Sequence, residues 1–497
     1  MGGRIVLERA GIDLERSFVE SVAAARKEEV HAPLAILVGS NLLGSHLRRT
    51  LAARLGGIFN IRFLTLADLA ETLARAAGGD AGSAPRFADR VIAGELVSSR
   101  DVSTVFGEAA KTRGFVEALL ATFSDLAEAG CSRDAAGAIL GGASGGHFAP
   151  ATREVLALYA SFREGIERLG GDVHSVFQSA LAAPVPPSIG AKVFAYGFYD
   201  FNEMQRRLLV RLSRERDVTL FIPWEEGEAY RFVARSRKRL EESGFETAAS
   251  AGTKDERPAC ATKLLNVPGE EQEIREIARR IIGLAGAGEV RFGEMALVLP
   301  SLETYGPLCG EVLGEAGIPY YLNADAFAAR SAAAKGAAAL LAMLGGAMER
   351  RDLVEFLVSA PLVSAEAAPE TVDLFALWVR RSAEAGLAGE RGWIAESAAL
   401  VERLALAAEK DPGEGEAHGA AVEVDRMIGI IQGAGEAARR LTTWRGHAMA
   451  VSSLLRELFV ESEDREAVCG AIEALGALDA TGSGVSFEKF SRLAVEA

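Results

Sequence analysis

The sequence has 497 residues, of which 49% are hydrophobic and 25% are charged, with a formal net charge of −15 at pH 7. This length exceeds what one hydrophobic core normally serves, so we expect roughly three or four domains. The composition is typical of a globular protein. The acidic balance is a mild argument against a uniformly basic nucleic-acid-binding face. It leaves room for a local basic groove, because electrostatic steering depends on where the charges lie.

The four cysteines are too widely spaced to indicate a disulfide framework or a metal site. Cys131, Cys260, Cys309 and Cys469 are at least 49 residues apart, whereas disulfide scaffolds and zinc sites use closely spaced cysteines. We find no signal peptide near the N-terminus and no uninterrupted apolar run that could span a bilayer. The sequence therefore predicts a reduced, cytoplasmic protein without a bound metal.

After a charged N-terminal segment, residues 34–38 (LAILV) predict a buried strand. The next segment, 39–46, has the Gly-x-x-x-x-Gly frame of a P-loop and leads into a helix with leucines four residues apart. A P-loop continues with a lysine for the phosphates and a serine or threonine for Mg²⁺. Those two positions hold Ser45 and His46. We interpret the segment as a degenerate nucleotide site made by Gly39, Gly44, Ser45 and His46.

A second strand is predicted over 61–66, followed by a helical stretch over 67–77 and a Gly-rich linker over 78–85. From 86 to 183 the pattern is mainly helical, with an interruption near 141–150. Ser144 lies there in a Gly-x-Ser-x-Gly match. A hydrolase nucleophile elbow needs a preceding strand, and a helical pattern precedes this match. We therefore interpret it as a turn.

The stretch 193–212 (VFAYGFYDFNEMQRRLLVRL) predicts a strand, a turn and a helix. Its first four residues form an apolar run that is too short for a helix, and Gly197 breaks this run. Met204, Leu208 and Leu212 then recur at helical spacing. Ligands of open α/β sheets bind where such strands end, so we expect a site beside Tyr196 and Gly197.

Another strand is predicted over 218–222, and a polar linker over 248–258. Beyond the linker, short apolar runs predict strands over 263–267 and 295–299. Helical spacing predicts helices over 270–284 and 305–313. From 331 to the end the patterns are helical.

The stretch 193–212 resembles motif II of superfamily-one DNA helicases of the UvrD type, whose pattern is roughly V-D-E-F-Q-D-T-N-x-x-Q. Tyr196 and Gly197 stand where the family carries Asp-Glu. In the family that aspartate helps to hold Mg²⁺ and the glutamate orients the attacking water. Tyrosine and glycine supply neither a hard-cation ligand nor a base. Four residues stand in register with the rest of the pattern: Phe198, Asp200, Asn202 and Gln205.

Two later segments extend the resemblance. Residues 296–301 are similar to the family's A-I-L-x-R-x-N element, and 318–320 match its I-P-Y element. The family's arginine that contacts ATP is Pro300 here. The segment after the 218–222 strand keeps a tyrosine, Tyr230, but lacks the glutamine that senses the γ-phosphate. The resemblance thus implies that four nucleotide contacts are absent.

The resemblance implies an α/β fold with two RecA-like parallel-sheet domains of the P-loop type, each with a mainly helical inserted domain. The second motor domain would be incomplete. The expected boundaries are 1–85 and 186–260 for the two parts of the first RecA-like domain, 86–185 for its helical insert, 261–346 for the partial second RecA-like domain, and 347–497 for the second helical insert.

The chain keeps the order of helicase segments but lacks the ATP-binding motifs. This combination is most similar to the AddB or RecC type, the inactivated-helicase partners in bacterial double-strand-break-processing helicase–nucleases. The implied function is a non-catalytic DNA-binding scaffold in repair and recombination. Its implied partners are single-stranded or forked DNA and an active UvrD-like helicase subunit of the AddA type. We expect no cofactor in this chain. The iron–sulfur cluster and Mg²⁺ would belong to a PD-(D/E)XK nuclease domain downstream, this chain being the N-terminal portion of an exonuclease subunit.

The resemblance also suggests DNA contacts, with a solvated helix face as the alternative for the basic residues. Two other functions stay open at this point: an active helicase with divergent motifs, and a purely protein-binding platform. The residues near family DNA or nucleotide surfaces are Arg48, Arg49, Arg62, Thr65, Arg206 and Arg207.

Overall fold

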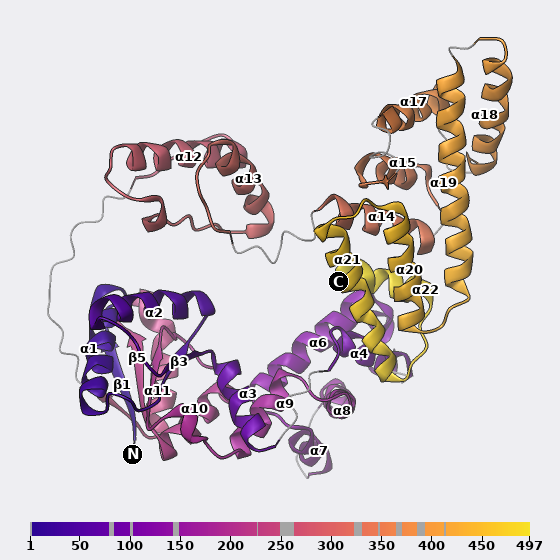
Figure 1. Cartoon of the computed structure of the whole chain (residues 1–497). Coiled ribbons are helices and arrows are strands. Elements are labelled where there is room, and N and C mark those ends of the chain that lie inside the picture. The colour runs from indigo at the N-terminus through magenta and orange to yellow at the C-terminus, as the bar shows by residue number, and fades with distance from the viewer. Residues whose placement is uncertain are drawn as a thin grey trace. The chain divides into compact units, whose positions relative to one another are not determined.

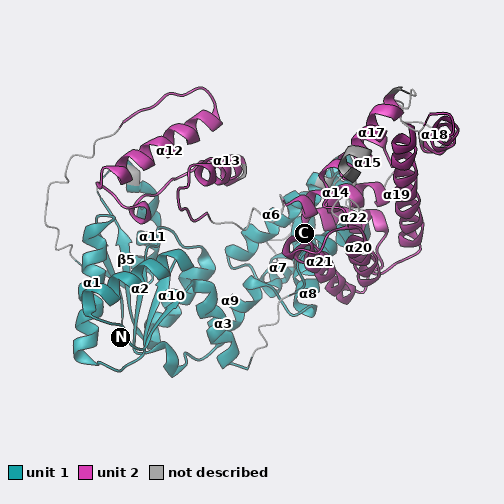
Figure 2. Cartoon of the chain, turned by 45° about the horizontal axis from the view of Figure 1, so that its top comes forward, with its two compact units in different colours: residues 1–256 teal, residues 257–497 magenta. Residues whose placement is uncertain are grey.

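The chain divides into two units, residues 1–256 and 257–497 (Figure 2). Among the described residues, no helix combines the length and the apolar character that crossing a membrane requires. The computed structural model describes residues 2–78, 84–99, 103–142, 149–225, 227–248, 263–322, 331–345, 348–363, 370–384, 393–411 and 414–497, so the predicted turn at Ser144 and most of the linkers at 78–85 and 248–258 lie outside the described residues.

Unit 1 is built on one six-stranded sheet in which every pair of neighbouring strands is parallel (Figure 1). The strand order is β3-β2-β4-β5-β1-β6. This confirms the α/β fold class and a parallel sheet. The strands are β1 (Gly3–Glu8), β2 (Leu34–Val38), β3 (Ile61–Leu64), β4 (Lys192–Tyr196), β5 (Asp217–Pro223) and β6 (Phe245–Ala248).

Helices cover both faces of this sheet because its strands carry apolar side chains on both sides. In β4, Phe194 and Tyr196 face α1 (Ile12–Glu28) and α2 (Asn41–Leu55). Val193 and Ala195 face the opposite core. The helices on that second face are α3 (Leu66–Ala76), α9 (Val173–Ala182), α10 (Glu203–Glu215) and α11 (Arg231–Glu242).

The connections place a switch point between β2 and β4. The chain leaves β1 and β2 through α1 and α2 on one face, and it leaves β4 and β5 through α10 and α11 on the other. The helices that follow two adjacent strands therefore diverge to opposite faces. Such a divergence opens a crevice at the carboxyl ends of the strands, the usual ligand position in open α/β sheets.

A helical portion of unit 1 lies between β3 and β4 in sequence and has its own core. Phe123 and Phe162 pack at 4.9 Å between ring centroids, and Tyr159 is fully buried beside them. Its helices are α4 (Ala88–Ser99), α5 (Ser103–Phe106), α6 (Arg113–Glu128), α7 (Arg133–Gly141) and α8 (Pro150–Arg168).

Unit 2 is helical in its described residues. One pair, α12 (Glu270–Gly286) and α13 (Leu302–Glu315), packs around Ile274 and Cys309, which confirms a core role for that cysteine. A second group packs around aromatic side chains such as Trp378 and Trp444. It comprises α14 (Ala332–Gly345), α15 (Arg350–Ser359), α17 (Glu370–Glu384), α18 (Trp393–Ala408), α19 (Gly415–Arg439), α20 (Trp444–Leu458), α21 (Glu463–Ala474) and α22 (Phe487–Glu496).

The strands predicted over 263–267 and 295–299 are wrong. Both segments are described, and neither forms a strand. Leu264 is 97% exposed and Val298 is 90% exposed. A strand needs a neighbouring backbone for its N–H and C=O groups, and the described residues offer these two segments none. The described part of unit 2 pairs extended backbone only in an isolated bridge between Leu362 and Phe459.

Candidate functional site at the carboxyl edge of the sheet

The switch point brings two glycine turns together. Val38 and Tyr196 are paired at the ends of β2 and β4. A Cβ atom added to Gly39 would lie 3.6 Å from the carbonyl oxygen of Gly197. Gly197 has a φ of 78°, a left-handed conformation that favours glycine. The structure therefore gathers Gly39, Tyr196 and Gly197 at one edge of the sheet, at the switch point between β2 and β4.

The turn after β2 is too short to form a phosphate-binding loop. Only Gly39 and Ser40 separate β2 from α2. Ser40 caps the helix, since its hydroxyl accepts a hydrogen bond from the Leu43 N–H at 3.2 Å. Gly44 consequently lies inside α2, where its Cβ position is 3.4 Å from the Val38 side chain. The second glycine of the predicted P-loop frame thus serves helix-to-sheet packing.

An apolar side chain lies in the crevice itself. A Cβ atom added to Gly197 would lie 2.6 Å from Cδ2 of Leu43, so the leucine packs directly over this turn. Ser45 is exposed on α2. The imidazole of His46 interacts with the Glu15 carboxylate of α1 at 2.7 Å. The two positions that would serve a nucleotide in a P-loop are thus a surface serine and a histidine paired with α1.

Tyr196 is part of the core. It is buried, and its ring packs against Phe18 with 4.9 Å between centroids. Burial raises the pKa of Tyr196 to about 12, and the nearby charges of Glu15 and Tyr199 add to the shift. Its hydroxyl therefore stays protonated at neutral pH.

The other motif-II positions stabilise local structure. The Asp200 carboxylate accepts hydrogen bonds from the Phe201 N–H at 2.8 Å and from the Ser236 hydroxyl of α11. Gln205 forms a capping box with Asn202 at the start of α10. Pro300 lies in unit 2, directly before Ser301, the N-cap of α13.

Four of the residues predicted to contact DNA lie on or near β3. The guanidinium of Arg48 lies over the Phe63 ring, 5.0 Å from its centroid, and Arg49 is exposed on α2. Arg62 donates to the Ser188 hydroxyl at 3.4 Å. Thr65 caps α3 in a capping box with Asp68. The local contacts give Thr65 a structural role.

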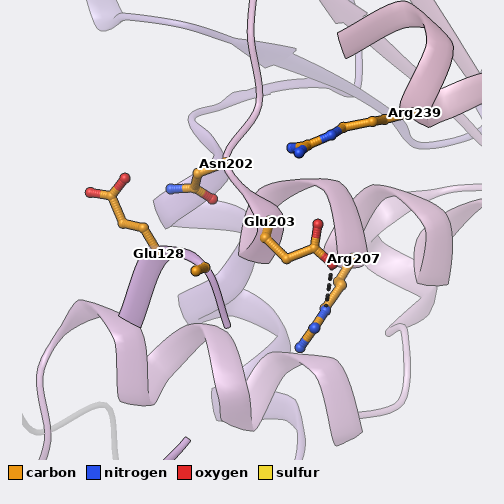
Figure 3. Close-up of a pocket in the computed structure, with 6 residues that line it drawn as sticks. Glu128, Asn202, Glu203, Arg207 and Arg239 are labelled. Atoms are coloured by element: carbon orange, nitrogen blue, oxygen red, sulfur yellow. Dashed lines mark hydrogen bonds and ion pairs between the residues drawn. The ribbon is translucent and has the colours of Figure 1, made fainter. Parts of the chain in front are cut away.

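The other two, Arg206 and Arg207, share one carboxylate. Glu203 accepts from Arg206 at 2.6 Å and from Arg207 at 2.8 Å. The Arg206 hydrogen bond is the main cause that lowers the pKa of Glu203 to about 2. Glu203 and Arg207 line an open pocket of about 450 Å³. Figure 3 shows both side chains, with the Arg239 side chain reaching toward the pocket from α11. Asn202 and Glu128 line the same pocket.

Sequence reasoning missed an exposed aromatic pair at the same edge. Tyr199 follows β4, and Phe232 lies in the first turn of α11, which follows β5. Their ring centroids are 6.1 Å apart, and the residues are 46% and 55% exposed. The available signal was an aromatic residue in the segment that follows each of two predicted strands, since Tyr199 lies three residues after β4 and Phe232 nine residues after β5.

Neither protein-family models nor curated proteins gave a match to this chain. Within the described residues, no group of three or more His, Cys, Asp and Glu side chains is placed to hold a metal ion.

Proposed function

We propose that this chain is a cytoplasmic, non-catalytic DNA-binding scaffold of a double-strand-break-processing helicase–nuclease. It would bind single-stranded or forked DNA and pair with an active UvrD-like helicase subunit. The sheet of unit 1 would be a RecA-like domain without nucleotide chemistry, and residues 261–346 would correspond to an incomplete second motor domain. The motif resemblance at 193–212 supports this assignment, as does a parallel sheet with a switch point at the same motif.

The observation that carries the DNA-binding part is the Tyr199–Phe232 pair. Large aromatic rings on a protein surface are the usual platforms on which unpaired bases stack. Here two such rings lie 6.1 Å apart at the ligand-binding edge of the sheet. Arg235, one turn further along α11, is exposed beside Phe232 and offers a charge for the backbone.

The closed crevice supports the non-catalytic part. Phosphoryl transfer depends on positioned cations and on an oriented nucleophile. At this edge, Leu43 packs over Gly197, and the turn after β2 holds only two residues. The Asp200 carboxylate is already engaged by the hydroxyl of Ser236. These contacts leave no cradle for a triphosphate between β2 and β4.

The test is a titration of labelled single-stranded DNA, followed by fluorescence anisotropy. We expect binding that weakens with salt, and we expect Phe232→Ala to reduce affinity about tenfold, since stacking contributes roughly 1–3 kcal/mol per base. Phe59→Ala is the matched control, because Phe59 is also an exposed aromatic, 66% accessible, but lies just before β3 at the opposite edge of the sheet.

A parallel assay measures ATP hydrolysis with and without DNA. We expect none in either condition. DNA-stimulated hydrolysis would contradict the non-catalytic assignment, and a wild-type chain that binds no DNA even at low salt would contradict the DNA-binding one.

A further inference from the structure

A second groove, lined mainly by arginines, runs along α10. Its volume is about 510 Å³. Arg207, Arg211 and Arg214 recur at intervals of four and three residues, which places them on one face of the helix. No carboxylate is among the described residues that line this groove. They are Leu181, Arg206, Arg207, Val210, Arg211, Arg214 and Ser243.

The groove keeps an excess of positive charge after its ion pairs are considered. Glu203 is shared by Arg206 and Arg207, and Glu215 pairs with Arg211 at 3.1 Å. Arg214 is exposed, and the described residues give it no ion pair. Nη1 of Arg211 is buried and has no hydrogen-bond partner among the residues that the structure describes. Four guanidinium groups therefore face three carboxylates, since Glu242 also interacts electrostatically with Arg206, in a chain whose net charge is −15.

A seam of contacts between α11 and residues 199–206 runs from the aromatic pair to this groove. α11 lies beside the segment that leads into α10: Phe232 contacts Tyr199, and Ser236 donates to Asp200. Further along, Ser243 accepts a hydrogen bond from Arg206. The path from Phe232 to Ser243 is about 16 Å at the helical rise per residue.

The pocket of Figure 3 lies midway along this seam. Arg239 of α11 reaches toward it, across from Asn202 and Glu203 of the α10 start. Arg207 lines both this pocket and the groove, so the two hollows meet at its side chain.

We infer that the α10 groove binds the phosphate backbone of the same single strand whose bases stack on Tyr199 and Phe232. This inference rests on the proposed function and assigns a place to the backbone. The planar guanidinium group matches phosphate oxygens through paired N–H donors. The groove lining has no aromatic ring, so its contacts are independent of base identity.

The residues that line the groove favour a nucleic-acid backbone over an acidic protein segment as its ligand. Protein partners are usually held by large side chains buried in apolar pockets. Only two side chains of the groove, Leu181 and Val210, are aliphatic. A chain of phosphates needs no such anchor, because counterion release supplies most of its binding energy.

The experiment compares Arg207→Gln/Arg214→Gln with Arg153→Gln/Arg168→Gln. The control residues are exposed on α8, so both double variants lose the same charge from exposed helix faces of unit 1. Arg211, which donates to the Ala183 carbonyl, is kept for the integrity of the fold. Binding of labelled oligothymidylate and of a mixed-sequence strand is measured over a salt series. Thermal unfolding of each variant checks that it is folded.

For the groove variant we expect the slope of log affinity against log salt to become shallower by about 1.4, since each single-strand phosphate contact contributes roughly 0.7. The change should be equal for both oligonucleotides, and the α8 control should keep the wild-type slope. If the double variant does not fold, Arg214→Gln alone should make the slope shallower by about 0.7.

Three outcomes would overturn the inference. A groove variant with the slope of the α8 control would exclude the groove as a phosphate site while wild-type binding upheld the scaffold function. Polyglutamate that binds the wild type and not the groove variant, with DNA affinity unchanged between them, would assign the groove to an acidic protein. A wild-type chain without DNA binding would remove the proposed function as well.

Discussion

Two short apolar segments, one in each unit, share a pattern and have different structures. Residues 193–196 (VFAY) form most of β4, a central strand between β2 and β5. Residues 296–299 (ALVL) form no strand, and Val298 among them is 90% exposed. Local sequence predicts the same state for both. The difference teaches that an apolar run becomes a strand only where neighbouring strands complete its hydrogen bonds.

Two ion pairs, one in each unit, differ in how deeply they are buried. In unit 1, Arg163 is 1% exposed and donates to Asp172 at 2.7 Å and to Ser175 at 2.8 Å. In unit 2, Arg456 is 40% exposed, and it pairs with Glu466 and Glu473 across the surface of α20 and α21. Buried pairs are costly to break, whereas exposed ones contribute little.

The largest expected effect is a difference in unfolding free energy between substitutions in the two apolar segments. Phe194→Ala should cost about 3–5 kcal/mol of unfolding free energy, because the ring is buried between Phe18 and Phe221. Val298→Ala should change stability by no more than about 0.5 kcal/mol. Urea unfolding followed by circular dichroism measures both. A large cost for Val298→Ala would show that this side chain is buried in solution.

The buried ion pair should give the next largest effect. Burial alone would raise the pKa of Asp172, but the hydrogen bond and charge of Arg163 outweigh it and lower the pKa. Asp172→Asn removes that partner and leaves a guanidinium group buried without a counter-charge, at a cost of roughly 3 kcal/mol. The same urea titration of Glu466→Gln should match the wild type. Equal effects of the two substitutions would remove the contrast between the units.

The smallest effect is a pH dependence at the α10 arginines. The pKa of Glu203 is lowered to about 2 from an ordinary value of 4.5. Its pairing therefore stabilises the fold fully above the ordinary value and loses this contribution as the pH falls toward 2. Melting temperatures recorded across this range should decline less steeply for Glu203→Gln than for the wild type. Parallel curves would show that the Glu203 pairing is absent in solution.

The sequence predicted three strands of the sheet closely, and it missed two. Residues 34–38, 193–196 and 218–222 are continuous apolar runs, as expected of strands buried on both faces, and they coincide with β2, β4 and the core of β5. β1 lies in the charged N-terminal segment, where Arg4 and Glu8 flank an apolar run of only three residues. β6 has only four residues and one fully buried side chain, Phe245.

The candidate site divides in the same way. Local patterns placed Gly39 directly after the strand at 34–38 and Gly197 directly after the run at 193–196. The pairing of β2 with β4, which brings both turns to the same edge, came from the fold. The packing of Leu43 over Gly197 was not predictable, because it depends on how early α2 begins. The arginine groove was also not predictable from the sequence, because its lining comes from α9, α10 and the end of α11, segments that only the fold brings together.

By itself, the sequence determined the class of the fold and the residue types that stand at its motif-like positions. Both are recorded locally, as apolar runs bounded by glycine and as particular residue types at particular spacings. The tertiary structure decided which apolar runs pair, which carboxylates are already occupied, and where aromatic and arginine side chains meet. These depend on contacts between residues that are distant in the chain. Such contacts follow from packing, which local sequence patterns do not encode.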